Sequence, residues 1–197
     1  IKGAHVFEVE NPGIYNNVGI FDFKSMYPSV MIKNNICPTS YTKEEVDGCV
    51  RSPLGAFFKQ DRKGIVPTVL KELWTWRDET KKKSEKVGDY YDRLQSSIKV
   101  IMNSFYGVMA SDFYRFTNPL IGGSITAFSR EGIKSAYAEL ENRGLNVIYG
   151  DTDSVFVHLN TKDDPFYIAK ELSKDGMEME VEKILQSFFT HGAKKRY

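Results

Sequence analysis

Two carboxylates one residue apart, Asp151 and Asp153, occupy the tip of a predicted β-hairpin. Apolar runs rich in β-branched and aromatic residues flank this tip, and Gly-Asp between two such runs is typical of a hairpin turn. A third acid, Asp22, lies near the end of the short apolar run 18–23. If the strands that carry these acids are neighbours in one sheet, the three carboxylates converge.

Converging carboxylates need a compensating positive charge. Two of them about 4 Å apart repel by about 4 kcal/mol near a protein surface. Neither strand contains a lysine or arginine. Mg²⁺ is the natural counter-charge, because proteins commonly bind it through one or two carboxylates together with substrate phosphates. On the hairpin alone the alternative is turn chemistry, because an Asp side chain can satisfy backbone groups of a tight turn.

A second set of polar residues follows the spacing of helices. Long helices are predicted over residues 67–86 and 89–107, and they form an antiparallel pair because the connection is short. The first carries two cations one turn apart, and the second carries an ammonium, an amide and a phenol on one stripe: Arg77 and Lys81, and Lys99, Asn103 and Tyr106. Facing stripes would form a cationic slot suited to a triphosphate. The alternative is that both stripes are solvated faces of amphipathic helices.

The other elements are strands and helices without a regular βαβ order. We expect strands at 5–10, 18–23 and 176–184, a turn at 10–17, irregular structure with short strands at 35–64, and helices at 25–35, 119–142 and 164–174. Ser25 is expected to cap the helix that it begins. The carboxylate-bearing strands are therefore separated by helices, which predicts an α+β core with an inserted helical lobe.

The composition is that of a folded chain. The 197 residues are 41% hydrophobic and 27% charged, which argues against disorder, and a net charge of +1 gives no information about an anionic partner. No apolar run reaches the roughly 18 residues of a membrane span, and no signal peptide opens the chain. Two cysteines and three scattered histidines argue against zinc, and Cys37 and Cys49 are expected to be free thiols. Neither end looks natural, so we expect a piece of a larger protein.

Three segments resemble the polymerase motifs A, B and C of the family B DNA polymerases, in that order. They are DFKSMYPS at 22–29, KVIMNSFYG at 99–107 and YGDTDS at 149–154. The resemblance runs through the whole chain, since KGAHVFEVENPG looks like the lead into the palm, GIVP like the start of the fingers and KKRY like the palm–thumb motif. Met26 replaces a more usual Leu, an apolar exchange that should be harmless, and KGA replaces a more usual double glycine.

The resemblance implies a polymerase palm, an antiparallel sheet backed by helices, with the fingers inserted as a helical hairpin. Residues 1–63 would form the first part of the palm, 64–107 the fingers, and 108–197 the second part of the palm up to the thumb. The implied activity is template-directed transfer of nucleotides from dNTPs to a primer 3′-hydroxyl. The amino-terminal domain, the proofreading exonuclease and the thumb would lie outside the chain, and without a thumb the fragment alone should hold duplex poorly.

The resemblance also implies cofactors and partners. Two Mg²⁺ ions, for which Mn²⁺ should substitute, would be held by Asp22, Asp153 and the carbonyl of Phe23, with Asp151 nearby as a further catalytic acid. The partners would be primer–template DNA, dNTPs and a sliding clamp bound through other regions, and no membrane. The enzyme would work at the nucleoid in the cytoplasm of a prokaryote, or in the nucleus of a eukaryote.

Individual roles follow by similarity. Tyr27 would lie under the incoming sugar and leave no room for a 2′-hydroxyl. Triphosphate oxygens would be bound by side chains of both long helices and by two backbone amides at a helix start: Arg77, Lys81, Lys99 and Asn103, and Ser25 and Met26. Tyr106 and Gly107 would line the nascent base pair. The duplex backbone would contact the basic end of the chain: Lys194, Lys195 and Tyr197.

Three other functions use part of the same pattern. A two-metal nuclease or phosphohydrolase needs the carboxylates, but it needs neither the helix stripes nor a sugar gate. A reverse transcriptase also has converging acids, but its hairpin usually carries adjacent aspartates, whereas Thr152 separates them here. A polymerase-like module that only binds DNA or a partner typically loses its acids, and this chain keeps all three.

Overall fold

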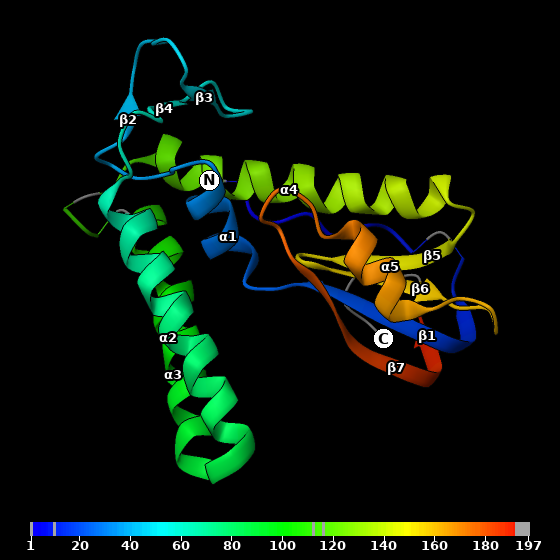
Figure 1. The fold of residues 1–197 in the computed structure, drawn as a ribbon. Coiled ribbons are helices and arrows are strands. Elements are labelled where there is room, and N and C mark those ends of the chain that lie inside the picture. The colour runs from blue at the N-terminus through cyan, green and yellow to red at the C-terminus, as the bar shows by residue number, and fades with distance from the viewer. Residues whose placement is uncertain (1, 10, 112, 116, 192–197) are drawn as a thin grey trace. The chain divides into compact units, whose positions relative to one another are not determined.

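The computed structural model has a mixed α+β fold and describes residues 2–9, 11–111, 113–115 and 117–191, without the side chains of 85–87. In chain order the elements are β1 (Gly13–Phe23), α1 (Met26–Lys33), β2 (Tyr41–Thr42), β3 (Val50–Arg51), β4 (Phe57–Phe58), α2 (Ile65–Val87), α3 (Asp89–Ala110), α4 (Pro119–Asn142), β5 (Asn146–Asp151), β6 (Ser154–His158), α5 (Pro165–Leu172) and β7 (Met179–Thr190) (Figure 1). The chain divides into two compact units: a first unit of Ile1–Lys2 and Tyr27–Phe128, and a second unit of Gly3–Met26 and Ser129–Tyr197.

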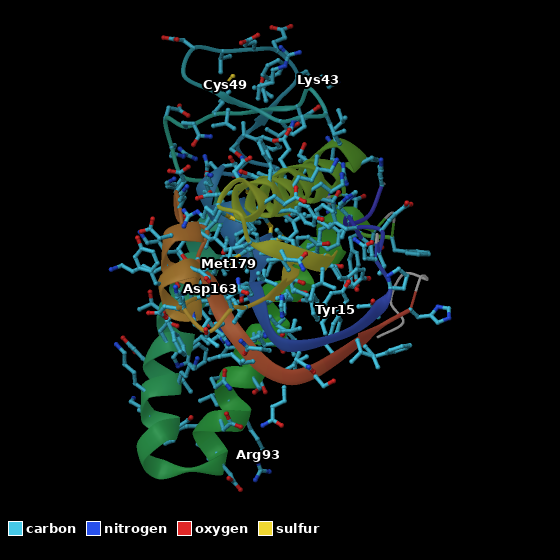
Figure 2. The ribbon with its side chains drawn as sticks, turned by 90° about the vertical axis from the view of Figure 1, so that its right-hand side faces the viewer. Tyr15, Lys43, Cys49, Arg93, Asp163 and Met179 are labelled. Carbon is cyan, nitrogen blue, oxygen red and sulfur yellow. The ribbon has the colours of Figure 1, made fainter. Side chains whose placement is uncertain are left out.

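The second unit contains an antiparallel sheet in the strand order β5-β6-β1-β7. Figure 2 shows β1 and β7 as a long ribbon, with Tyr15 on β1 and Met179 at the start of β7. All four strands contribute to the apolar cluster of this sheet, which consists of Val18, Ile20, Ile148, Tyr149, Phe156 and Phe188. Burial of such aliphatic and aromatic side chains is the main force that holds the sheet together.

The observed strands differ from the predicted ones because they pair with strands that are distant in the sequence. The turn expected at 10–17 is wrong for its second half, because β1 already begins at Gly13 and pairs there with the end of β7. For the same reason β7 extends to Thr190, well beyond the predicted 176–184. The strand expected at 5–10 is reduced to one isolated bridge between Val6 and Asp151.

The first unit contains the helical hairpin and a small sheet. Helices α2 and α3 run side by side (Figure 1), joined by Gly88, whose φ of 94° is readily adopted only by glycine. The small antiparallel sheet has the order β2-β4-β3, and its connections carry Lys43 and Cys49, which are labelled in Figure 2. The antiparallel helical pair predicted from the short connection is confirmed.

The helix boundaries lie within two residues of the prediction except at the end of α3, and one predicted cap is not formed. Helix α3 runs on to Ala110, so Gly107 lies inside the helix rather than at its end. Ser25 precedes α1 as expected, but its hydroxyl is buried and has no hydrogen-bond partner among the described residues, so the predicted cap is wrong. Its backbone is in the left-handed region at φ 48°, whereas a capping residue usually has extended φ and ψ. Asp164 does cap α5, by accepting from two backbone amides of the first turn.

The irregular segment after α1 is fixed by one buried side chain. Asn35, fully buried and at φ 53°, donates from Nδ2 to the carbonyls of Lys59 and Arg62, at 2.6 and 2.9 Å. Its Oδ1 accepts from the amide of Gly64 at 2.8 Å. These bonds hold the end of α1 against the residues that lead into α2.

The described residues show neither a membrane-spanning helix nor a disulfide bond. None of the helices there combines the length and the apolar character that a membrane crossing requires. Cys37 and Cys49 are both free thiols, as the sequence predicts.

Candidate active site

The strand register brings two of the three acids into one row of the sheet. Asp22, near the end of β1, lies directly opposite Ser154 of β6, and Ser154 lies opposite Asp151 of β5. Directly opposite residues of antiparallel strands point to the same face, so Asp22 and Asp151 share a face with Ser154 between them. The prediction that the acid-bearing strands are neighbours in one sheet is confirmed.

The third acid occupies the turn beside this row. The backbone carbonyl of Asp153 accepts a hydrogen bond from the amide of Phe23 at 2.9 Å, so the residue after Asp22 is bonded directly to the turn. Thr152 adopts a left-handed φ of 59°, and its hydroxyl donates to the carboxylate of Asp151 at 2.9 Å. Turn chemistry therefore accounts for part of the role of Asp151. All three acids are half-buried.

A fourth acid near the row was missed from the sequence. Glu180 of β7 lies directly opposite Asp22 on the other side of β1. Its signal is the alternation of glutamates in MEMEVEK, which places every second side chain of a strand on one face. The neighbouring glutamate, Glu178, forms an ion pair with Lys24 at 3.2 Å. Carboxylates therefore lie on both sides of the end of β1, from β5 and the β5–β6 turn on one side and from β7 on the other.

The chemistry of these donors suits a hard divalent cation. Mg²⁺ takes oxygen ligands and is usually held by one or two carboxylates, with water and substrate phosphates completing its shell. Asp22, Asp153 and the main-chain carbonyl of Phe23 are oxygen donors from adjacent parts of one sheet. Across the ranges that the structure describes, no group of three or more His, Cys, Asp and Glu side chains is arranged so that it could hold a metal ion.

In the first unit, two tyrosines from distant parts of the chain meet. Tyr27 lies in the first turn of α1 and Tyr106 lies near the end of α3, and their ring centroids are 4.5 Å apart. Offset aromatic contacts of this kind fix both rings more firmly than area burial alone. Both residues are half-buried.

The cations of the helical hairpin differ strongly in exposure. Lys81, Lys99 and Asn103 are exposed, whereas Arg77 is only 9% exposed and its Nε is buried without a hydrogen-bond partner. Buried guanidinium donors are normally satisfied, because leaving one unpaired costs about 1–3 kcal/mol or more. Among the residues that the structure describes, the Nε of Arg77 is therefore an exception to this rule.

Gly107 presents an open stretch of helix. A methyl group added there would meet nothing within 4 Å among the described atoms, although glycine inside a helix costs about 0.5–1 kcal/mol relative to alanine. Packing within the described chain does not require glycine at this position.

The predicted duplex contacts Lys194, Lys195 and Tyr197 lie outside the described residues. The backbone amides of Ser25 and Met26 stand at the start of α1, where helical amides lack intrahelical partners. Met26 itself is buried.

Comparison with known proteins gives one consistent result. The sequence model described as "DNA polymerase family B" matches residues 1–197. A DNA polymerase of Archaeoglobus fulgidus is 34% identical over all of this chain and 26% of its own length, and DNA polymerase 2 of Aeropyrum pernix is 32% identical over 94% of the chain and 24% of its own. The solved family B DNA polymerase of the archaeon Pyrobaculum calidifontis superposes with a TM-score of 0.81 at 33% identity, over the whole chain and 27% of that structure. The chain thus spans about a quarter of the length of these relatives.

Proposed function

The chain belongs to the family B DNA polymerases, and we propose that it carries their palm and fingers and adds deoxynucleotides to a primer 3′-hydroxyl under the direction of a template. Residues 1–63 and 108–197 would form the palm, and residues 64–107, which hold α2 and most of α3, would form the fingers. The observation that carries the proposal is the register of β1 and β6, which joins Asp22 to the turn of Asp153.

The carboxylates of Asp22 and Asp153 and the carbonyl of Phe23 would hold two Mg²⁺ ions, for which Mn²⁺ should substitute. Bound there, the ions supply charge for the attacking and leaving oxygens of an in-line displacement. Asp151 would act beside them, with its carboxylate oriented by the Thr152 hydroxyl. Asp22 and Asp151 would be fixed by their strands, and the turn that carries Asp153 is bonded to the end of β1 through the amide of Phe23.

Both long helices would contribute groups that bind the nucleotide. Arg77, Lys81 and Lys99 would supply charge-assisted hydrogen bonds to the triphosphate, with Asn103 assisting. The amides of Ser25 and Met26 would add donors at the helix start.

Selection of the nucleotide would depend on shape. Tyr27, held by Tyr106, would lie under the deoxyribose and exclude a 2′-hydroxyl. The open helix face at Gly107 would let the nascent base pair approach the backbone closely. Lys194, Lys195 and Tyr197 would contact the duplex, and a sliding clamp would bind through other regions. The enzyme would work at the nucleoid in the cytoplasm of a prokaryote, or in the nucleus of a eukaryote.

The test is the chemistry of the products. The longest natural chain that contains this sequence is incubated with primer–template DNA, dNTPs and Mg²⁺. We expect the primer to grow by the templated base with one pyrophosphate released per nucleotide. Release of nucleoside monophosphates without pyrophosphate would instead indicate a nuclease, and a strong preference for an RNA template would indicate a reverse transcriptase. DNA binding without either reaction would indicate a module that has lost its chemistry.

A further inference from the structure

We infer that the N-terminal segment of residues 3–7 positions the carboxylate turn, and that the fit between Phe7 and Gly150 sets its place. The inference rests on the proposed function, because the turn matters through Asp151 and Asp153. Every residue in the argument belongs to the second unit.

Backbone hydrogen bonds attach this segment to the hairpin. The amide of Phe7 donates to the carbonyl of Gly150 at 2.9 Å, and the amide of Thr152 donates to the carbonyl of His5 at 2.9 Å. An antiparallel bridge joins Val6 to Asp151 between these two bonds. The segment therefore extends the sheet beyond β5 and is bonded to the turn itself.

The bond at Thr152 is made where the turn is most constrained. Thr152 is a β-branched residue at φ 59°, a conformation that costs about 1–3 kcal/mol and persists only when its surroundings enforce it. The carbonyl of His5 is one group that enforces it. Because Thr152 lies between the two carboxylates, its conformation sets the direction in which each of them leaves the backbone.

Close packing of one ring fixes the position of the segment. A methyl group added to Gly150 would lie 2.6 and 3.0 Å from two ring atoms of Phe7, which is inside van der Waals contact. The ring cannot retreat freely, because Tyr137 of α4 stacks on it with a centroid distance of 4.4 Å and an interplanar angle of 12°. Arg130, almost two turns earlier on α4, holds the start of the segment by donating to the carbonyl of Gly3 at 2.7 Å.

The contact predicts coupling between positions 7 and 150. Gly150→Ala should push the Phe7 ring outward and loosen both backbone bonds, whereas the same change should be tolerated when residue 7 is alanine. A double-mutant cycle of Phe7→Ala and Gly150→Ala measures this coupling directly. The matched control is Gly132→Ala on α4, where a methyl group would meet only ordinary contacts, the nearest at 3.7 Å.

Amide hydrogen exchange of the 197-residue chain is the first readout. We expect Gly150→Ala to accelerate exchange at Thr152 by about tenfold or more when residue 7 is Phe and by less than about twofold when it is Ala. The amide of Val157, in the middle of β6, reports global opening and should not change. Equal acceleration in both backgrounds, or acceleration at Val157 to the same extent, would overturn the inference.

The second readout separates positioning from simple structure. Mn²⁺ alone is titrated by its paramagnetic effect, and turnover is measured in the longest natural chain. We expect Gly150→Ala to weaken Mn²⁺ binding and to lower kcat about tenfold with KM for dNTP unchanged, and Phe7→Ala to remove most of that effect. Altered exchange with unchanged Mn²⁺ affinity and kcat would contradict a positioning role. Failure of the unaltered chain to bind Mn²⁺ would instead count against the proposed function, while the exchange result would still decide whether the segment holds the turn.

Discussion

The rings of Tyr27 and Tyr106 lie against each other with 4.5 Å between their centroids and 44° between their planes. The two residues are brought together by α1 and α3, so the position of the Tyr27 ring depends on the helical hairpin. A ring that is held in this way can act as a rigid wall, because displacing it would also displace its neighbour.

Loss of that wall should relax the choice of sugar. We expect Tyr27→Ala to raise the incorporation of ribonucleotides relative to deoxynucleotides by at least about tenfold, because a steric exclusion of the 2′-hydroxyl is removed. Tyr27→Phe keeps the ring and is the matched control. The measurement is kcat/KM for a dNTP and for the corresponding ribonucleotide, and equal selectivity in Tyr27→Ala and wild type would remove the gate hypothesis.

Asp153→Asn should abolish extension while DNA binding persists. The amide keeps the shape of the side chain but not the charge that holds a divalent cation, so we expect kcat to fall at least about 100-fold. Asp47→Asn, at an exposed carboxylate of the first unit, is the control. Single-turnover extension and duplex affinity are measured together, and turnover like that of wild type would refute the metal-binding role.

Lys99→Ala should weaken the use of dNTP. Hydrogen bonds to charged groups contribute about 1.5–3 kcal/mol, so kcat/KM for dNTP should fall by about tenfold or more. Lys82→Ala removes an exposed lysine outside the Arg77 and Lys81 stripe and should leave kcat/KM unchanged. If the two variants behave alike, the stripe on α3 is only a solvated helix face.

Gly107→Ala should trade activity for stability. Alanine should stabilise α3 by about 0.5–1 kcal/mol, because no described atom opposes the added methyl group. The same methyl group should obstruct the nascent base pair and lower kcat/KM. Gly132→Ala, in the interior of α4, should be neutral or stabilising without this loss of activity. Denaturant unfolding and primer extension give the two quantities, and a stabilised variant with full activity would show that Gly107 has no such role.

Glu139→Gln should destabilise the protein in a pH-dependent way. The hydrogen bond from Lys174 and the neighbouring Arg143 lower the pKa of Glu139 below its ordinary value of 4.5, although partial burial opposes them. A lowered folded-state pKa means that the contribution is complete above about pH 4.5 and is lost as the pH falls through the folded value. The loss at pH 7 should stay below about 1 kcal/mol, because the cluster is near the surface. Urea unfolding at pH 7 and at pH 3 checks this, and the same difference at both values would contradict it.

The local patterns of the chain predicted the helices and the carboxylate hairpin well. Gly144 indicates the end of helix α4, and Gly150 with Asp151 indicates the turn between β5 and β6. The periodicity of apolar residues within each segment indicates the type of element. The extent of β1 and β7 could not be read in this way, because Gly13 pairs with Thr190, 177 residues away. Strand length depends on a partner that no local window contains.

Local patterns also indicated only some of the candidate site residues, because the other residues are brought together by pairing between distant strands. Motif spacing pointed to Asp22 and Asp153, and the register shows that their strands are neighbours. Glu180 was missed because only the pairing of β1 with β7 places it opposite Asp22. Two buried polar atoms, the Nε of Arg77 and the hydroxyl of Ser25, have no hydrogen-bond partner among the described residues. Their burial results from tertiary packing, so it could not be predicted from the pattern of residue types.

The hydrogen bonds of the Asn35 side chain affect which part of this protein can vary in sequence and length. Its bonds to Lys59, Arg62 and Gly64 close off the excursion that holds β2, β3 and β4, so the two ends of that excursion meet whatever its length. Loop closure becomes only slowly costlier as residues are added. Evolution can therefore lengthen, shorten or rewrite this stretch while α2 still begins at the same point relative to α1.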